Sequence, residues 1–328
     1  MDKIRFSEGE VIFREGDFGK AMYEIYSGKV RIVSGYDTED MMDLTELKRG
    51  AIFGEMAIID IYPRSTTAIA KTDVCLIEVP DSKLSEYFNE KPERIMAIMK
   101  NLSGRIRALT KDYMEVCETI NEAADDGVEL MHTEGLLTKL RKFAGIYTKN
   151  EKALMRYEER KKGRPDNEVQ GFVSFFKKGD IIFKEGDDSL CMYEICRGSV
   201  GIYANYGKPD QKLITKLPSE KFFGEMGMID NEPRSATAVA LEDVSLGFIY
   251  PDKLAELFNE RPAKVMMILQ HLTDRLRRLT LDYIRACKTS LEILKAEEAG
   301  GELEPEASGW VKFFCEVGKY GRYYTITK

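Results

Sequence analysis

The sequence predicts a mainly β protein built from two copies of one domain, each with long helices after its strands. The first observation behind this prediction is a repeat: residues 53–70 match residues 223–240 at 12 of 18 positions, at a constant offset of 170. The second is a change of hydrophobic period within each copy, from two to between three and four. Together they predict two small sandwiches or barrels, each followed by an amphipathic helix.

The repeat extends well beyond that segment, because residues 6–120 recur at 176–290. A unit of this length is a duplicated domain rather than the unit of roughly 20–50 residues found in solenoids. Each copy is long enough to bury a core of its own. We therefore expect a first domain over 1–120, a helical connector over 121–170, a second domain over 171–290 and a C-terminal tail over 291–328.

Short alternating runs mark the expected strands. Apolar residues alternate over 23–25 and again over 30–32, on either side of the turn Ser27-Gly28. This pattern predicts two half-buried strands joined by a tight turn. The second copy repeats the pattern around Gly198.

The expected helices follow the strands. Apolar residues recur every three or four positions over 95–117 and over 265–287, which predicts a long amphipathic helix in each copy. Pro92 and Pro262 lie near the helix starts, where a missing N–H costs least.

The connector and the tail carry patterns of their own. A helical stripe runs through Leu136, Leu137, Leu140, Phe143, Ala144 and Tyr147. Residues 139–164 hold ten Lys or Arg against three Asp or Glu. We interpret this as a solvated helix face, with a DNA-reading helix as the alternative. The tail is acidic over 292–306 and then aromatic, so it either packs on the chain, docks on a partner or covers a pocket.

Composition excludes several classes of protein. With 49 basic and 56 acidic side chains the net charge is −7, which argues against a protein built mainly to hold nucleic acid. No apolar run is long enough to span a membrane, and the N-terminus lacks the apolar core of a signal peptide. The six cysteines form no CxxC pair, so we expect reduced thiols and a cytoplasmic location. The two histidines occupy non-equivalent positions, so we expect no metal site and no catalytic residues.

The repeated motif suits a sugar-phosphate ligand. Gly54 can adopt a positive φ or let the backbone approach a ligand closely. The residues after it can form one helical turn whose free N–H groups face an anion. Arg64 offers a planar fork of donors that suits a phosphodiester, and Ser65 adds a hydroxyl beside it. Glu55 cannot favour a phosphate, so we expect it to face hydroxyls such as those of a ribose.

These residues resemble the phosphate-binding cassette of the cyclic-nucleotide-binding domain family, and the likeness includes Phe13, Gly16 and the Ser27-Gly28 turn. The resemblance implies the cyclic-nucleotide-binding fold, with two β jelly-roll barrels each followed by long helices that move on ligand binding. It implies that Gly54 and Glu55 meet the ribose 2′-OH, that Arg64 meets the cyclic phosphate, and that Met56 and Ala57 offer backbone near the phosphate. The Ser65 hydroxyl would lie near the phosphate or the base. The second pocket would use Gly224, Glu225, Met226, Gly227, Arg234 and Ser235.

Two further expectations come from this resemblance. Family members often cap the base with a side chain from the last helix, which makes Tyr113 and Tyr283 the candidates. The alternative for both is a core-facing aromatic on the apolar stripe. Glu220 stands where the first copy has Gly50, which casts doubt on the loop before the second cassette but not on the cassette.

The function that follows is a sensor that binds cAMP, or cGMP, at two sites and signals by helix movement to a protein partner. A homodimer is compatible with this function. No cofactor is expected beyond this ligand. One alternative is a transcription regulator with an unrecognised DNA-binding segment. Another is a scaffold that has kept its fold and lost its ligand. A kinase regulatory subunit fits the tandem order, although the first barrel begins close to Met1, leaving no room for a dimerisation helix.

Overall fold

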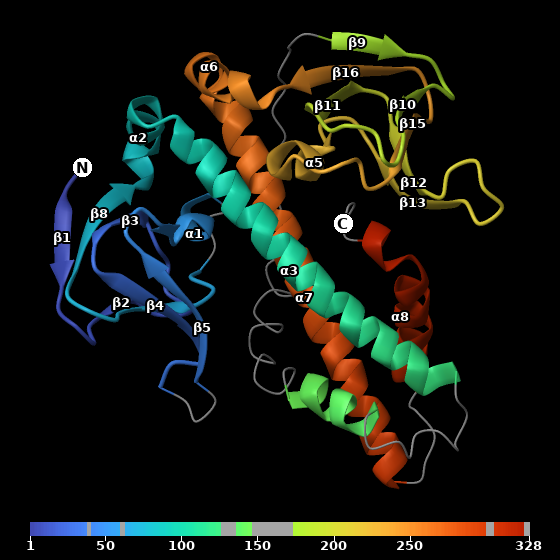
Figure 1. Ribbon diagram of the computed structural model, residues 1–328, viewed down its shortest axis with the longest axis horizontal. Helices are drawn as coiled ribbons and strands as arrows, with labels where there is room; N and C mark the ends of the chain where they lie inside the picture. The colour runs from blue at the N-terminus through green and yellow to red at the C-terminus, as the bar shows by residue number, and fades with distance from the viewer. Residues whose placement is uncertain (38–40, 60–62, 126–135, 146–172, 300–304, 325–328) are drawn as a thin grey trace. The chain divides into compact units, whose positions relative to one another are not determined.

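The computed structural model describes residues 1–37, 41–59, 63–125, 136–145, 173–299 and 305–324 (Figure 1). Within these ranges both copies of the repeat have the same order of strands and helices. In the first copy the elements are β1 (Lys3–Phe6), β2 (Val11–Phe13), β3 (Ala21–Ser27), β4 (Lys29–Ser34), β5 (Met42–Lys48), β6 (Ile52–Phe53), α1 (Glu55–Ile59), β7 (Thr67–Ala70), β8 (Val74–Pro80), α2 (Leu84–Glu90) and α3 (Glu93–Asp125).

The second copy repeats this order and adds a C-terminal helix. Its elements are β9 (Val173–Phe176), β10 (Ile181–Phe183), β11 (Met192–Arg197), β12 (Val200–Ala204), β13 (Lys212–Leu217), β14 (Phe222–Phe223), α5 (Glu225–Asp230), β15 (Thr237–Ala240), β16 (Val244–Ile249), α6 (Leu254–Glu260), α7 (Pro262–Ala299) and α8 (Pro305–Tyr324).

The strands of each copy pair into two antiparallel sheets of four. In the first copy the orders are β1-β8-β3-β6 and β2-β7-β4-β5, and in the second they are β9-β16-β11-β14 and β10-β15-β12-β13. The two copies therefore share one topology, and the predicted fold class is confirmed. In each copy the described strands form two separate sheets, not one closed barrel.

Three aromatic rings fill the core beneath each repeated motif. Phe13, Tyr23 and Phe53 meet with ring centroids 5.5–6.1 Å apart. Their counterparts Phe183, Tyr193 and Phe223 lie 5.1–5.9 Å apart. Because Phe53 and Phe223 directly precede the motif glycines, each cluster fixes the start of a motif against the sheet.

A buried carboxylate joins the first sandwich to its helices. Glu24 on β3 accepts hydrogen bonds from Tyr87 Oη at 2.9 Å, Lys91 Nζ at 2.8 Å and the Arg94 guanidinium. Burial acts to raise the pKa of Glu24, but the bonds from Lys91 and Tyr87 and the charge of Arg94 together hold it below its ordinary value. Since β3 pairs with β6 at Ile52, this cluster links α2 and α3 to the strand that leads into the motif.

The predicted long helices are confirmed as α3 and α7, which run side by side (Figure 1). The thiols of Cys117 on α3 and Cys287 on α7 are buried and close enough to influence one another's ionisation. Burial raises the pKa of Cys287 to about 12. The connector stripe forms a helix over 136–145, while Tyr147 lies outside the described residues.

The tail packs on the chain as helix α8. Phe314 is fully buried and meets Tyr113 of α3 edge to face, with ring centroids 6.2 Å apart. Lys212 on β13 also pairs with Glu316 of α8 at 3.2 Å. Among the three alternatives for the aromatic tail, packing on the chain is the one that the structure contains.

The chain forms two compact units that do not coincide with the two copies of the repeat. One unit holds residues 1–101 and 252–274, and the other holds 102–251 and 275–328. Each unit thus combines the strands of one copy with helical segments from both copies. The domain boundaries expected from the repeat remain predictions.

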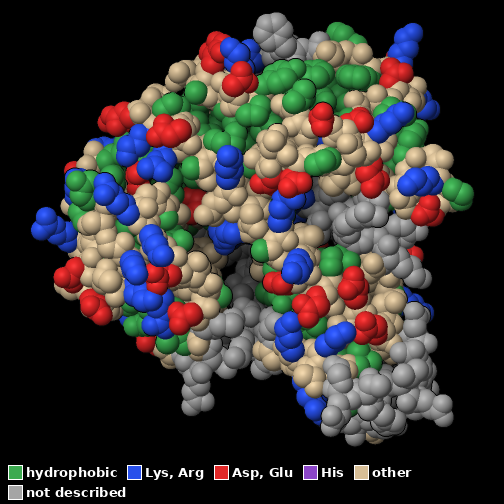
Figure 2. All heavy atoms as spheres, viewed as in Figure 1, with side chains coloured by type: hydrophobic (Ala, Val, Ile, Leu, Met, Phe, Trp, Pro, Cys, Tyr) green, Lys and Arg blue, Asp and Glu red, His purple; other side chains and the backbone are tan. Residues whose placement is uncertain are grey.

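Within the described residues, few features of the surface and the helices suggest a membrane-spanning or metal-binding function. On the face in Figure 2 acidic and basic side chains are interspersed, and apolar side chains gather over β9 and β16. Phe175 on β9 is 84% exposed. No helix within the described ranges combines the length and apolar character needed to cross a membrane. The same residues contain no group of three or more His, Cys, Asp or Glu placed to hold a metal ion.

The loop before the second motif keeps its shape despite Glu220. Gly50 has a φ of 86° and Glu220 a φ of 67°, so both are left-handed. Their N–H groups donate to the carbonyls of Ile25 and Ile195, each at 2.8 Å. The doubt about this loop is therefore resolved: the turn is the same, and Glu220 carries the backbone strain that glycine avoids.

Replacing Glu220 with glycine should stabilise the protein by about 0.5–1 kcal/mol, because relief of the left-handed strain exceeds the added chain entropy. Urea denaturation measures this. Gly50→Glu is the matched control. A Cβ there meets no atom within 4 Å, so only the left-handed backbone strain acts, and stability should fall by a similar amount. A lower stability for Glu220→Gly would contradict the strain argument.

A second difference between the copies is an exchange of small residues. The first copy pairs Gly19 with Ala57, whereas the equivalent positions in the second hold Ser189 and Gly227. A Cβ added at Gly227 would lie 2.2 Å from Ser189 Oγ. Ala57 and Ser189 are both buried. In the second copy, the space between α5 and the loop after β10 thus holds one side chain, not two, whereas in the first copy a Cβ at Gly19 would meet the Arg64 guanidinium.

Gly227→Ala should therefore destabilise the protein by about 1–3 kcal/mol through overpacking. Adding Ser189→Gly should recover part of this loss, because the double variant recreates the Gly19–Ala57 pairing. Urea denaturation of the two single variants and the double variant tests this exchange. Additive losses in the double variant would show that the two positions do not compete for the same space.

Candidate functional site

The two candidate sites are the first cassette, residues 53–65, and the second cassette, residues 223–235. In each, a short strand ends, a left-handed glycine follows and a short helix begins. The φ values of Gly54 and Gly224 are 74° and 76°. A Cβ at either glycine would lie 2.5 or 2.6 Å from Nη1 of Arg64 or Arg234. Both the backbone conformation and the close guanidinium therefore require glycine.

Each arginine is buried and bonded to backbone carbonyls of its own copy. Arg64 donates to Gly54 O and Ala21 O, both at 2.6 Å, and is 5% exposed. Arg234 donates to Gly224 O at 2.7 Å and to Cys191 O at 2.6 Å, with the same exposure. The arginine thus connects the turn that opens the cassette to the neighbouring strand or loop.

Aromatic faces hold both guanidinium groups in place. The Arg64 Cζ atom lies 4.2 Å from the Phe13 ring centroid, and the Arg234 Cζ atom lies 4.3 Å from that of Phe183. A guanidinium over an aromatic face gains cation–π attraction that grows as water is removed. The repeated phenylalanine therefore belongs to the site as well as to the core.

The main chain at each arginine is fixed by the loop after β2 or β10. The Arg64 N–H donates to Asp17 O at 2.7 Å, and the Gly16 N–H donates to Arg64 O at 2.9 Å. The second cassette has the matching pair between Arg234 and the Asp187 and Gly186 backbone, both at 2.8 Å. Gly16 and Gly186 have φ values of 88° and 89°, so this loop requires glycine where it meets the arginine.

One donor of each guanidinium has no partner within the described part of the chain. The Nε–H groups of Arg64 and Arg234 are buried and donate to no acceptor there. Burial lowers the pKa of Arg64, while Tyr23, Glu55 and Asp17 act in the opposite direction. An arginine stays protonated in any protein, so each site holds a buried cation with an unused N–H.

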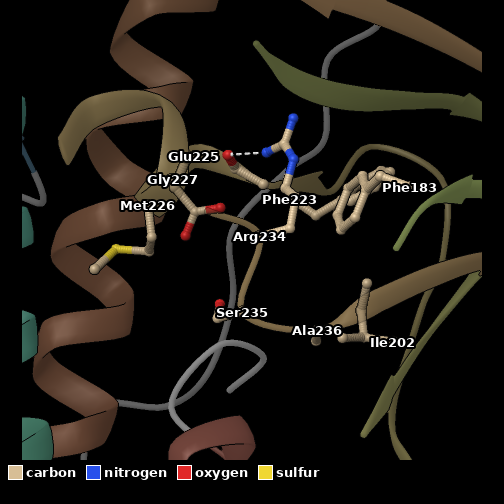
Figure 3. A pocket seen from close by; sticks show the side chains of 10 residues that line it. Phe183, Ile202, Phe223, Glu225, Met226, Gly227, Arg234, Ser235 and Ala236 are labelled. Atoms are coloured by element: carbon tan, nitrogen blue, oxygen red, sulfur yellow. Dashed lines mark hydrogen bonds between the residues drawn. The ribbon is translucent and has the colours of Figure 1, made fainter. Parts of the chain in front are cut away.

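The second cassette lines a pocket (Figure 3). Its walls include Gly224, Glu225, Met226, Gly227, Arg234 and Ser235, together with Phe183, Ile202, Phe223 and Ala236. In Figure 3 the dashed line marks the bond from Arg234 to the Gly224 carbonyl. All six residues predicted for this site from its cassette thus lie around one pocket.

Glu225 of the second cassette forms a buried ion pair with Arg275. The Arg275 guanidinium on α7 donates to Glu225, and both side chains are at most 5% exposed. Burial lowers the pKa of Arg275, and the Glu225 carboxylate beside it acts in the opposite direction. The oxygens of such a carboxylate can also accept hydrogen bonds from hydroxyl groups.

The first cassette has the same elements within its own unit. Glu55, Met56 and Ala57 on α1 are buried, and the Glu55 charge acts on Arg64. Ser65 is exposed, as is Ser235 in the second cassette. Both copies thus bury the cassette glutamate and arginine and expose the serine, whereas Met226 and Gly227 are only half-buried.

The two tyrosines lie among the helices. Tyr113 is 3% exposed and packs on Phe314, while Tyr283 on α7 is not among the residues that line the second pocket. Burial raises the pKa of Tyr283. Their placement is that of the core-facing alternative, and capping of a base by either tyrosine stays a prediction.

Sequence reasoning missed Arg275 and the pocket residues Phe183, Ile202 and Ala236. A signal for Arg275 existed, because arginines recur at the offset of 170 as Arg105 and Arg275. Phe183 was visible as the repeat of Phe13, but its role depends on the guanidinium above it. Ile202 had only the alternation of a strand, which does not indicate a ligand.

Comparisons with known proteins agree with this geometry. The family described as "Cyclic nucleotide-binding domain" matches residues 3–91 and 173–261, more than half of the chain. A cAMP-dependent protein kinase regulatory subunit of Dictyostelium discoideum is 24% identical over 74% of this chain and 60% of its own length. The Cyclic AMP receptor protein of Thermus thermophilus is 28% identical over 42% of this chain and 62% of its own length.

Among solved structures, the regulatory domain of Toxoplasma gondii PKA with cAMP is 17% identical, with a TM-score of 0.25, covering 82% of this chain and 83% of that one. The chain spans less than two thirds of the length of the curated relatives named above. The matched segments contain both sandwiches and both cassettes. This chain belongs to the cyclic nucleotide-binding domain family, with two such domains in tandem.

Proposed function

We propose that this chain is a regulatory sensor that binds cAMP at both cassettes and passes the signal on through its helices. The observation that carries this proposal is the buried guanidinium, built twice, with an Nε–H that lacks an acceptor in the described residues. A single negative charge that brings several oxygens, such as a cyclic phosphate, would supply that acceptor. The names of the relatives, which include cAMP receptor and regulatory proteins, support cAMP as the ligand.

The residues around each guanidinium suit the rest of a nucleotide. The Glu225 carboxylate can accept a hydrogen bond from a ribose hydroxyl. Ligand binding would then change the bond between Glu225 and Arg275. Phe183, Ile202 and Ala236 supply apolar wall for a base. A scaffold that had lost its ligand would not need a buried cation with an unused donor, because such a group costs stability.

Arg64→Ala and Arg234→Ala should each weaken cAMP binding at their own site by about 2–5 kcal/mol, because the phosphate loses its charged partner. Titration calorimetry with cAMP measures both sites. Lys71→Ala is the control, since Lys71 pairs on the surface with Glu46 and should leave both affinities unchanged. Arg234→Lys keeps the charge but not the fork, and should fall between wild type and Arg234→Ala.

Unchanged affinity in both alanine variants would remove the cassettes as ligand sites. A parallel titration with cGMP separates the two bases. Tighter binding of cGMP would support the cassettes as ligand sites but show that cGMP, not cAMP, is the preferred ligand.

Helix movement has a built-in reporter. Trp310 on α8 is the single tryptophan of the chain. It stacks on Phe314, which meets Tyr113 of α3, and it lies 5.8 Å from the Arg285 guanidinium of α7. A ligand that shifts α3 or α7 should therefore change the emission of Trp310, and Arg234→Ala should reduce the change. Calorimetric binding without any change in emission would contradict signalling through these helices.

A further inference from the structure

The carboxyl end of the second cassette helix is bonded to a helix that belongs to the first copy of the repeat. Asp230, the last residue of α5, accepts a bond from Arg107 Nε at 2.7 Å and another from the Ser103 hydroxyl. Ser103 Oγ also lies 3.5 Å from the sulfur of Met226. All four residues lie in one compact unit, although Ser103 and Arg107 come from α3.

Asp230 needs these partners for an electrostatic reason. The carboxyl end of a helix carries partial negative charge, so an aspartate there is unfavourable unless a cation lies beside it. Arg107 supplies that cation, and Ser103, which is fully buried, supplies a second donor. Asp230 is 20% exposed at its side chain, so the pair is only partly screened by water.

The contact bears directly on the second pocket. Glu225, Met226 and Gly227 are residues of α5 that line the pocket, and Asp230 ends the same helix one turn later. A helix of this length moves as one piece, so holding its last residue and Met226 also holds its pocket-facing residues.

The other compact unit contains a reciprocal contact. Gln270 Nε2, on α7 of the second copy, donates to the carbonyl of Ile59, the last residue of α1, at 3.1 Å. The carbonyls in the last turn of a helix have no partner within the helix, so Gln270 caps α1. In both units, then, a polar side chain from the helix of one copy holds the cassette helix of the other.

We infer that Ser103 and Arg107 are positioning residues of the second ligand site, and that Gln270 is one for the first. Each site then depends on the closing helix of the other copy, which couples the two sites without using the connector. The inference rests on the proposed function, because it concerns affinity for the same ligand.

The test measures cAMP affinity by calorimetry at one site at a time. Second-site affinity is measured in an Arg64→Ala background and first-site affinity in an Arg234→Ala background. Arg107→Ala and Asp230→Asn should each weaken the second site roughly fivefold and leave the first unchanged. The double variant should be no weaker than either single one, and added NaCl should reduce the effect. Gln270→Ala should weaken the first site and spare the second.

A matched control is Lys142→Ala, which breaks the ion pair between Lys142, in the helix over 136–145, and Glu115 of α3. It should change neither affinity, because that pair contacts neither cassette helix. Equal affinities at the second site in wild type, Arg107→Ala and Asp230→Asn would overturn the inference and leave the proposed function intact. A general loss of fold would weaken both sites together, and that result would also overturn the site-specific role. Failure of wild type to bind any cyclic nucleotide would instead remove the proposed function.

Discussion

The buried guanidinium of each cassette is the interaction on which the rest of the site depends. Arg64 and Arg234 each donate to two backbone carbonyls. One is that of the cassette glycine, and the other lies at the start of β3 (Ala21) or directly before β11 (Cys191). A cation in that position costs desolvation energy, which the carbonyls and the aromatic face partly offset. The same bonds require a glycine at the turn, because a Cβ there would collide with the guanidinium. Glycine, arginine and phenylalanine therefore recur together in both copies for one physical reason.

Around this centre the two copies differ in how they solve the same packing problems. The second copy accepts a left-handed Glu220 where the first has Gly50, and it exchanges which of two neighbouring positions carries a side chain. Such differences change the surroundings of the cassettes and leave their glycine, glutamate, arginine and serine alike.

The helices connect the sites in a way that the order of the repeat does not suggest. Each compact unit takes helical segments from both copies, and each cassette helix ends on a side chain from the other copy. The aromatic tail joins this arrangement, because Phe314 of α8 packs on Tyr113 of α3. Ligand-dependent change in either cassette would therefore reach helices that both copies share, where a small shift can be read by a partner.

The duplication, the fold class, the long helices and the cassettes could be predicted from the sequence, because these depend on local signals. A glycine turn, a period-two strand and an apolar helical stripe each depend on residues close together in the sequence. Each of these patterns also occurs twice, at an offset of 170. Tertiary structure alone decided the partners of distant residues. Arg275 reaches Glu225, Arg107 reaches Asp230, and Tyr113 turns into the helical core although its position suited a base cap. Such contacts depend on how α3, α7 and the sheets pack, and no spacing along the chain encodes that geometry.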